Sequence, residues 1–197
     1  MFDQARDELL YSDVKGANPF KDRRVRLALY QALDVAALRD QVMRGSARVT
    51  AVALHGTRKL GIADSPEMRH PYDPARARAL LAEAGYPAGF GFTLHCPNDR
   101  WINDEKLCTA VATMWSRIGL RVLVDAIPKT RFFPKAGKRE ISAALSAWGT
   151  YSEEAIFILK PVRHTPMPDG SGAANFGGFS HAPLDELIDR IEAEPDI

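Results

Sequence analysis

Residues 92–148 constrain the fold most, because they predict two strand–helix–strand units in succession. Residues 92–96 alternate apolar and polar side chains, and Pro97 stops the segment as a strand. A helix follows, with Asn103 as its N-cap and Gly119 as the left-handed residue after its end. Its apolar stripe consists of Leu107, Val111, Met114, Trp115 and Ile118. Residues 120–127 predict a second strand, 131–138 a helix and 141–147 a third strand.

This alternation predicts an α/β fold with a βαβαβ parallel core and flanking helices. Strands joined by crossover helices run parallel, so the loops at 97–103, 128–131 and 148–153 emerge at one edge of the sheet. Ligands of open α/β sheets bind at that carboxyl edge. The residues that we expect to contact a ligand there are Asn98, Asp99, Arg100, Trp101, Trp148, Thr150 and Tyr151.

The rest of the chain predicts flanking elements. Asp34 and Asp73 each precede an apolar periodic segment and predict helix N-caps, and from Asp22 a helical stripe is formed by Val25, Leu29, Ala32 and Leu33. Residues 9–14 predict a short strand, 153–159 a short helix that ends before Pro161, and 46–71 and 161–183 loops. A last helix from residue 180 or 181 is expected to bury Leu184, Leu187, Ile188 and Ile191.

Composition excludes several classes of protein. A net charge of +1 gives no overall field that would attract nucleic acid or an anionic membrane. No apolar run reaches the length of a membrane span, and the first eight residues are too charged for a signal peptide. We therefore expect no nucleic-acid partner and no direct membrane insertion. We also expect that the protein is cytosolic or that its natural start lies outside this sequence.

The sequence predicts no catalytic or metal-binding residues and no cofactor. It lacks a phosphate-binding loop and a Gly-x-Ser-x-Gly turn, and its five histidines show no ligand spacing. Two cysteines make no disulfide framework. A small α/β enzyme would need a nucleophile or a metal, and hydrolysis assays against peptides and esters would reveal one.

Several segments resemble family 5 of the extracytoplasmic solute-binding proteins of ABC importers, which includes dipeptide, oligopeptide and nickel binders. Residues 18–29 read N-P-F-x-D-x-x-V-R-x-A-L, and residues 72–86 read Y-D-P-x-x-A-x-x-L-L-x-x-A-G-Y. I-G-L-x-V at 118–122 and N-F-G at 175–177, followed by L-D-x-L-I at 184–188, fit the same family in one register.

The resemblance implies a fragment of a longer, two-lobed protein that closes on its ligand at a hinge. Residues 1–17 would be the hinge strand and the entry from a missing first lobe. Residues 18–197 would be the second ligand-binding lobe, truncated before the return crossing. The parent would be periplasmic, or extracellular and lipid-anchored, with its signal peptide outside this sequence. It would work with the membrane subunits of an ABC transporter.

The resemblance also implies a non-enzymatic function, the capture of a peptide-like or other small anionic solute. Arg100 and Asn103 match the Arg-x-x-Asn of dipeptide binders, in which the arginine holds the peptide carboxylate. Trp148 matches a tryptophan that ends a later strand in those binders. In this chain Trp148 would either line one wall of the cleft or belong partly to the core. Those binders have an amine-binding aspartate where this chain has Tyr151, which argues against a ligand with a free ammonium group. The alternative is a ligand-sensing domain of a transcriptional regulator.

Overall fold

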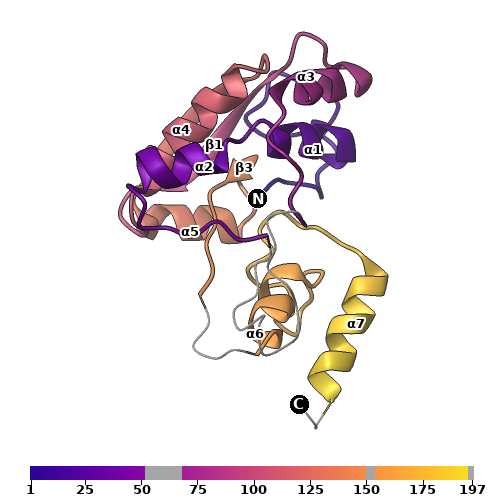
Figure 1. Cartoon of the computed structure of the whole chain (residues 1–197). Coiled ribbons are helices and arrows are strands. Elements are labelled where there is room, and N and C mark those ends of the chain that lie inside the picture. Colours follow the sequence, from indigo (N-terminus) through magenta and orange to yellow (C-terminus); the bar gives the residue numbers. More distant parts are fainter. Residues whose placement is uncertain (52–67, 150–153, 195–197) are drawn as a thin grey trace.

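The centre of the molecule is a sheet of three parallel strands, flanked by helices (Figure 1). In the computed structural model, residues 1–51, 68–149 and 154–194 are described. The strand order is β2 (Arg121–Ile127), β1 (Gly91–Pro97), β3 (Ala143–Ala144). Gly91 pairs with Arg121, and His95 pairs with both Asp125 and Ala144. The predicted parallel core is confirmed, but β3 is shorter than residues 141–147, because the exposed chain after Leu145 leaves the sheet.

The other side of β3 is paired by the first residues of the chain, and not by residues 9–14. Phe2 forms an antiparallel bridge with Ala143, and the N–H of Asp3 donates to the carbonyl of Ser142. The strand predicted at 9–14 is wrong, because Tyr11 adopts a left-handed conformation (φ 50°) within a turn. Ser12 makes one isolated bridge to Phe92. This turn therefore covers the start of β1 without extending the sheet.

Within the described residues, five short elements between residues 19 and 83 flank the sheet. They are η1 (Pro19–Lys21), α1 (Arg23–Gln31), α2 (Val35–Ala37), which continues as the π-helical segment η2 (Leu38–Val42), and α3 (Pro74–Glu83). The two predicted caps are confirmed: the carboxylates of Asp34 and Asp73 accept hydrogen bonds from backbone N–H groups in the first helical turn, and Asp22 caps α1 in the same way. Local sequence therefore fixes where these helices begin.

Helix α4 (Asp104–Ser116) packs on the sheet through a face centred on small residues. Its buried members are Asp104, Cys108, Ala112 and Trp115. The predicted stripe is correct for Trp115 and for Ile118 just beyond the helix, whereas Leu107 and Met114 are only half-buried. Cys108 and Ala112 are small enough to let the helix approach β1 closely, and the larger side chains then lie at the margins of the contact.

Helix α5 (Lys129–Gly137) contributes Phe132 and Ala136 to a second apolar cluster, in which they pack with Ile141 and Ala144. α5 begins two residues earlier than predicted, directly after Pro128. Because Pro128 has no N–H to satisfy, it suits a position at the start of a helix.

The last elements lie to one side of the sheet (Figure 1). They are α6 (Ile156–Ile158), the π-helical segment η4 (Leu159–Arg163) and α7 (Ala182–Ala193). The short helix predicted before Pro161 is present as α6, which begins at Ile156 and ends at Ile158, and the chain continues directly as η4, which contains Pro161. The buried side predicted for α7 is wrong in part, since Ile188 is buried while Leu187 and Ile191 are 51% and 39% exposed. None of the described helices is long and apolar enough to cross a membrane.

Candidate functional site

The loops that follow β1 and β2 lie together at the carboxyl edge of the sheet. Asp99 Oδ1 accepts a hydrogen bond of 2.7 Å from the backbone N–H of Lys129, and Lys129 Nζ donates to the carbonyl of Asp99 at 3.3 Å. The N–H of Asn98 donates to the carbonyl of Ile127 at 3.1 Å. The prediction that these two loops share one edge is confirmed, and the contacts between them hold the β1 loop in place.

A buried carboxylate fixes the turn that carries Arg100 and Trp101. Asp104 Oδ2 accepts the backbone N–H groups of both residues, at 2.9 and 3.0 Å, and its Oδ1 accepts that of Glu105. Burial by itself raises the pKa of the Asp104 carboxyl, but these N–H donors outweigh burial and hold that pKa below its ordinary value. Asp104 therefore stays ionised at neutral pH and keeps the turn ordered.

Asn103 does not cap α4 with its side chain, contrary to expectation. It occupies the N-cap position in a left-handed conformation (φ 57°), and its side-chain amide donates to the carbonyl of Val42 at 3.0 Å. At this end of the helix the side chain of Asp104 accepts the backbone N–H of Glu105. Asn103 thus links the site loop to the end of η2, a role that its sequence position did not indicate.

The exposed side chain of Arg100 and the half-buried side chain of Trp101 form a cationic and aromatic surface. The Arg100 guanidinium lies 5.8 Å from the centre of the Trp101 ring, which contacts the ring of Phe133 edge-on at 6.2 Å. Arg100 is exposed, and the neighbouring Ile102 is 73% exposed. A guanidinium held against an aromatic face can still present paired N–H donors to a carboxylate. This part of the edge can therefore bind an anion that also carries an apolar group.

Trp148 lies on the segment between β3 and α6. It is 45% exposed, and its indole N–H donates to the carbonyl of Phe157 at 2.8 Å. Of the two roles left open for Trp148, burial in the core is therefore wrong. Within the described residues no contact joins Trp148 to Arg100 or Trp101, and Thr150 and Tyr151 lie outside the described residues. The β3 side of the expected site thus stays a prediction.

A second polar cluster lies on the sheet face next to α5. His95 is 1% exposed, and among the described residues neither of its ring nitrogens has a hydrogen-bond partner. Its Nε2 lies 3.6 Å from Asp125 Oδ2, which also pairs with Lys135 of α5 at 3.4 Å. The ring of Tyr11 contacts the imidazole at 5.1 Å. Burial, assisted by the Lys135 ammonium, lowers the pKa of His95 below its ordinary value of 6.5.

This lowered pKa predicts a loss of stability in mild acid. The unfolded chain takes up a proton on His95 near pH 6.5 while the folded protein does not, so stability is complete above that pH and is lost as the pH falls below it. We expect His95 to change the free energy of unfolding by at most about 1.4 kcal/mol per pH unit. Urea denaturation at about pH 7.5 and about pH 5.5 measures the difference in this free energy. A His95→Leu variant should show a smaller difference between the two conditions, and an unchanged difference would contradict the assignment.

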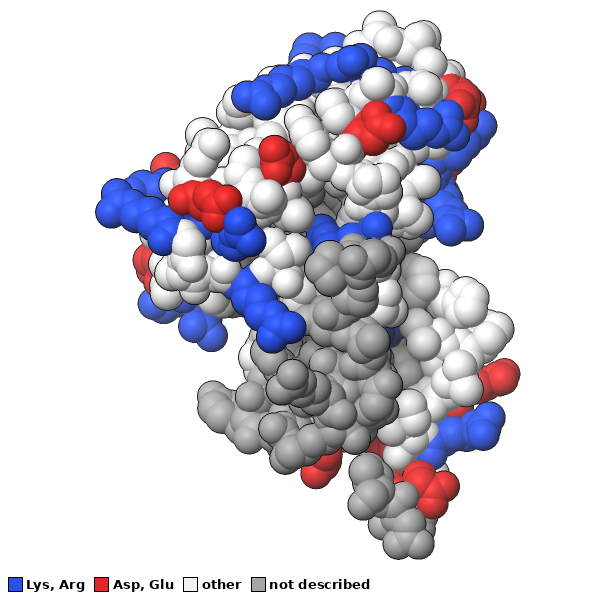
Figure 2. All heavy atoms as spheres, viewed as in Figure 1, with Lys and Arg blue, Asp and Glu red and all other residues white. Residues whose placement is uncertain are grey.

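Among the described residues, no group of three or more His, Cys, Asp or Glu side chains is arranged to hold a metal ion. On the face of the molecule in Figure 2, lysine and arginine side chains are interspersed with acidic ones over the upper part. This mixed surface agrees with the low net charge of the sequence.

A helix-flanked parallel sheet with its loops gathered at the carboxyl edge is the architecture of an open α/β sheet, a class of fold in which ligands bind at that edge. The model of the bacterial extracellular solute-binding proteins, family 5 (middle part), matches residues 3–167. The chain belongs to this family. Solved structures agree with the fold: the dipeptide-binding protein of Pseudoalteromonas sp. SM9913, in complex with Met-Leu, matches 96% of the chain with a TM-score of 0.78 at 20% identity. The chain covers 36% of that protein.

Curated relatives carry several different ligand names. Heme-binding protein A of Haemophilus influenzae is 26% identical over 87% of the chain, which covers 31% of that relative. The glutathione-binding protein GsiB of Pectobacterium atrosepticum is 30% identical over 73% of the chain and is covered to 28%. The dipeptide-binding protein of Escherichia coli is 26% identical over 90% of the chain and is covered to 33%. The chain thus spans about a third of the length of these relatives.

Proposed function

We propose that this chain is one ligand-binding lobe of the solute-binding protein of an ABC importer, and that it captures a peptide-like or other small anionic solute. The observation that carries the proposal is the Arg100–Trp101 turn, held in place by Asp104 at the carboxyl edge of the sheet. Membership of family 5 supports the class of protein. No observation favours the ligand-sensing domain of a regulator.

The proposed mechanism is hinge closure of two lobes. A ligand shifts the equilibrium toward the closed form only if it binds that form more tightly than the open form. A loop that is already fixed by the contacts of Asp99 and Asp104 needs no ordering when the ligand arrives, which lowers the cost of binding. Residues 1–17 would include the hinge, and residues 18–197 would form the lobe.

The proposed ligand carries a carboxylate or a similar anionic group, held by Arg100. Heme, glutathione and dipeptides, the ligands named for the relatives, all contain carboxylate groups. Asn98, Asp99 and Trp101 would line the site on the side of β1, and Trp148, Thr150 and Tyr151 on the side of β3. A tyrosine at position 151 cannot neutralise a buried ammonium group, so the ligand would place a neutral or aromatic group there.

The parent protein is proposed to act outside the cytoplasm, in the periplasm or as a lipid-anchored extracellular protein. Its partners would be the solute and the membrane subunits of the transporter. We propose no enzymatic activity, cofactor or metal for it. The description of the family as extracellular solute-binding proteins supports this assignment.

A thermal-shift screen of the two-lobed parent protein tests the proposed function. The panel consists of glutathione, Met-Leu, heme and non-peptide carboxylates, with free amines and neutral sugars as controls. A compound that binds only the folded protein at about 100 times its Kd should stabilise it by about 2.7 kcal/mol. We expect stabilisation by at least one carboxylate of the panel. Stabilisation confined to amines or sugars would contradict the proposal.

A further inference from the structure

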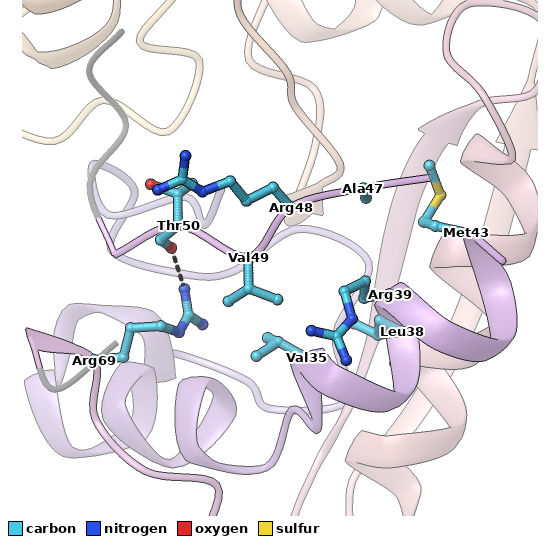
Figure 3. Close-up of a pocket in the computed structure, with 9 residues that line it drawn as sticks. All are labelled: Val35, Leu38, Arg39, Met43, Ala47, Arg48, Val49, Thr50 and Arg69. Atoms are coloured by element: carbon cyan, nitrogen blue, oxygen red, sulfur yellow. Dashed lines mark hydrogen bonds between the residues drawn. The ribbon is translucent and has the colours of Figure 1, made fainter. Parts of the chain in front are cut away.

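The charged groups around the small pocket beside η2 keep their charges near neutral pH (Figure 3). Arg39 and Arg69 are guanidinium groups, which are not deprotonated in proteins. A hydrogen bond from Arg39 lowers the pKa of Asp40, its ion-pair partner at 2.6 Å, below the ordinary value. A change of pH close to neutrality therefore leaves these contacts unaltered. A titratable ring that faces several acceptors lies elsewhere, at the end of η4.

His164 follows η4 directly, where this segment contacts α7, the last helix in Figure 1. The residue is 6% exposed. Its Nδ1 lies 2.6 Å from the carbonyl oxygen of Thr165 and 3.8 Å from Asp185 Oδ1, and its Nε2 lies 3.4 Å from Asp189 Oδ1. The ring is thus bounded by a carbonyl oxygen of its own segment and by two carboxylates of α7.

These oxygens select the doubly protonated form of the ring. Carbonyl and carboxylate oxygens accept hydrogen bonds and donate none. A neutral imidazole carries a hydrogen on one nitrogen, so its other nitrogen would direct a lone pair at an oxygen. The imidazolium form donates from both nitrogens, to the carbonyl of Thr165 on one side and toward Asp189 on the other. The geometry therefore favours a positively charged His164.

The carboxylates around the ring support this charge. Burial by itself raises the pKa of Asp185, but hydrogen bonds from the hydroxyl and the N–H of Thr165, at 2.6 and 2.9 Å, outweigh burial and hold that pKa below its ordinary value. The hydrogen bond to the Thr165 carbonyl, joined by the charges of Asp185, Asp189 and Asp169, raises the pKa of His164 above its ordinary value of 6.5, although burial opposes the rise.

The other charged side chains of η4 are engaged elsewhere. Lys160 forms an ion pair with Glu192 of α7, and Arg163 lies near the amino group of Met1. His164 therefore supplies the positive charge that faces the two carboxylates at the centre of the contact with α7.

We propose that His164 makes the attachment of α7 sensitive to pH. As an imidazolium it holds the helix against η4, and the loss of its proton in mildly alkaline solution weakens that contact. The ion pair between Lys160 and Glu192 and the burial of Ile188 do not depend on this proton, so α7 loosens without being released. The proposal does not depend on the proposed function.

The direction of the effect distinguishes His164 from His181, a second histidine beside α7. Because the pKa of His164 is raised in the folded chain, its contribution is complete below about pH 6.5 and is lost as the pH rises through the raised pKa. Nδ1 of His181 accepts the N–H of Leu184 at 3.2 Å, so protonation of His181 would remove this cap in acid. His164 therefore predicts a weaker α7 in alkali, and His181 a weaker α7 in acid.

Hydrogen exchange of the α7 backbone amides, measured by mass spectrometry on the millisecond timescale, tests the proposal. The chain is compared at about pH 5.5 and about pH 8.5, after correction for the intrinsic dependence of exchange on pH. We expect α7 to be about threefold less protected in the alkaline sample, because a short helix that loses a contact opens more often. The amides of α4 should show no such loss.

The matched variant is His164→Gln, whose side chain does not titrate. In this variant α7 should have the same protection at both pH values. Equal protection of α7 at both pH values in the unsubstituted chain, an alkaline loss that His164→Gln retains, or a loss in the acidic sample would overturn the proposal.

Titration of the His164 ring by NMR tests the cause in the unsubstituted chain, and it serves equally if His164→Gln does not fold. We expect a midpoint above 6.5. Asp189→Asn, at a side chain that is 62% exposed, should lower the midpoint by about 0.5 on the pH scale. Glu186→Gln removes the same charge from an exposed position on α7 and should lower it by less than about 0.1. A midpoint at or below 6.5, or equal effects of the two substitutions, would contradict the proposal.

Discussion

Replacing Trp115 with alanine is expected to lower the free energy of unfolding by about 3–5 kcal/mol. Trp115 is 4% exposed and contacts the rings of Phe2 and Phe92 in the core beneath α4. Its indole N–H also donates to the carbonyl of Leu29 at 2.9 Å in a buried position. Alanine would leave a cavity and would deprive that carbonyl of its donor. Urea denaturation followed by circular dichroism measures the change.

The matched control is Trp115→Phe, which keeps an aromatic ring in the core but removes the indole N–H. We expect it to cost about 1–3 kcal/mol, mainly through the unsatisfied carbonyl of Leu29 and the smaller ring. A loss below about 1 kcal/mol for Trp115→Ala would show that α4 does not pack on the sheet through this residue. The placement of the whole carboxyl edge would then be in doubt, because α4 begins at the site loop.

Replacing Arg100 with alanine in the two-lobed parent should weaken binding of its anionic ligand by about 2 kcal/mol or more, which is roughly 30-fold. The guanidinium is the charged group that the rigid turn presents at the carboxyl edge. Its loss would leave the ligand carboxylate without a bidentate partner. Calorimetry with the compound identified in the thermal-shift screen measures the effect.

Arg117→Ala is the matched control for Arg100→Ala, because Arg117 is an exposed arginine at the opposite end of α4. It should leave the affinity unchanged within about twofold. Similar weakening by both substitutions would indicate a general effect of charge, and unchanged affinity in Arg100→Ala would remove Arg100 from the site. Either result would contradict the proposed ligand chemistry.

The sequence predicted the fold wherever local signals decide the structure. Asp34 and Asp73 cap their helices, as predicted, because a carboxylate before an apolar periodic segment satisfies the first N–H groups. Gly119 ends the α4 region in a left-handed conformation (φ 95°), which favours glycine. Two crossover helices then require parallel strands, which bring the loops at Asp99 and Lys129 to one edge. The helix ends are set by residues next to them in the sequence, and the parallel strand direction is set by the crossover helices.

Features that depend on packing between distant segments were not predictable in this way. Periodicity cannot show that α4 approaches β1 through Cys108 and Ala112 in preference to its larger side chains. It also cannot show that Phe2 pairs with β3, or which apolar side chains of α7 find a partner. The position of the Asn98–Trp101 loop at the carboxyl edge was predicted, but the role of Asp104 was not, because a carboxylate in a first helical turn usually signals only a favourable helix dipole.

Calorimetry on this 197-residue chain by itself, with the compound that the two-lobed parent binds, tests the central claim most directly. A single lobe supplies only part of the contacts and cannot exclude water, so little free energy remains after the cost of association. We predict a Kd weaker than about 100 μM for the chain, with the parent binding far more tightly. Micromolar or tighter binding by the chain would show that it forms a complete site, and would contradict the two-lobe account.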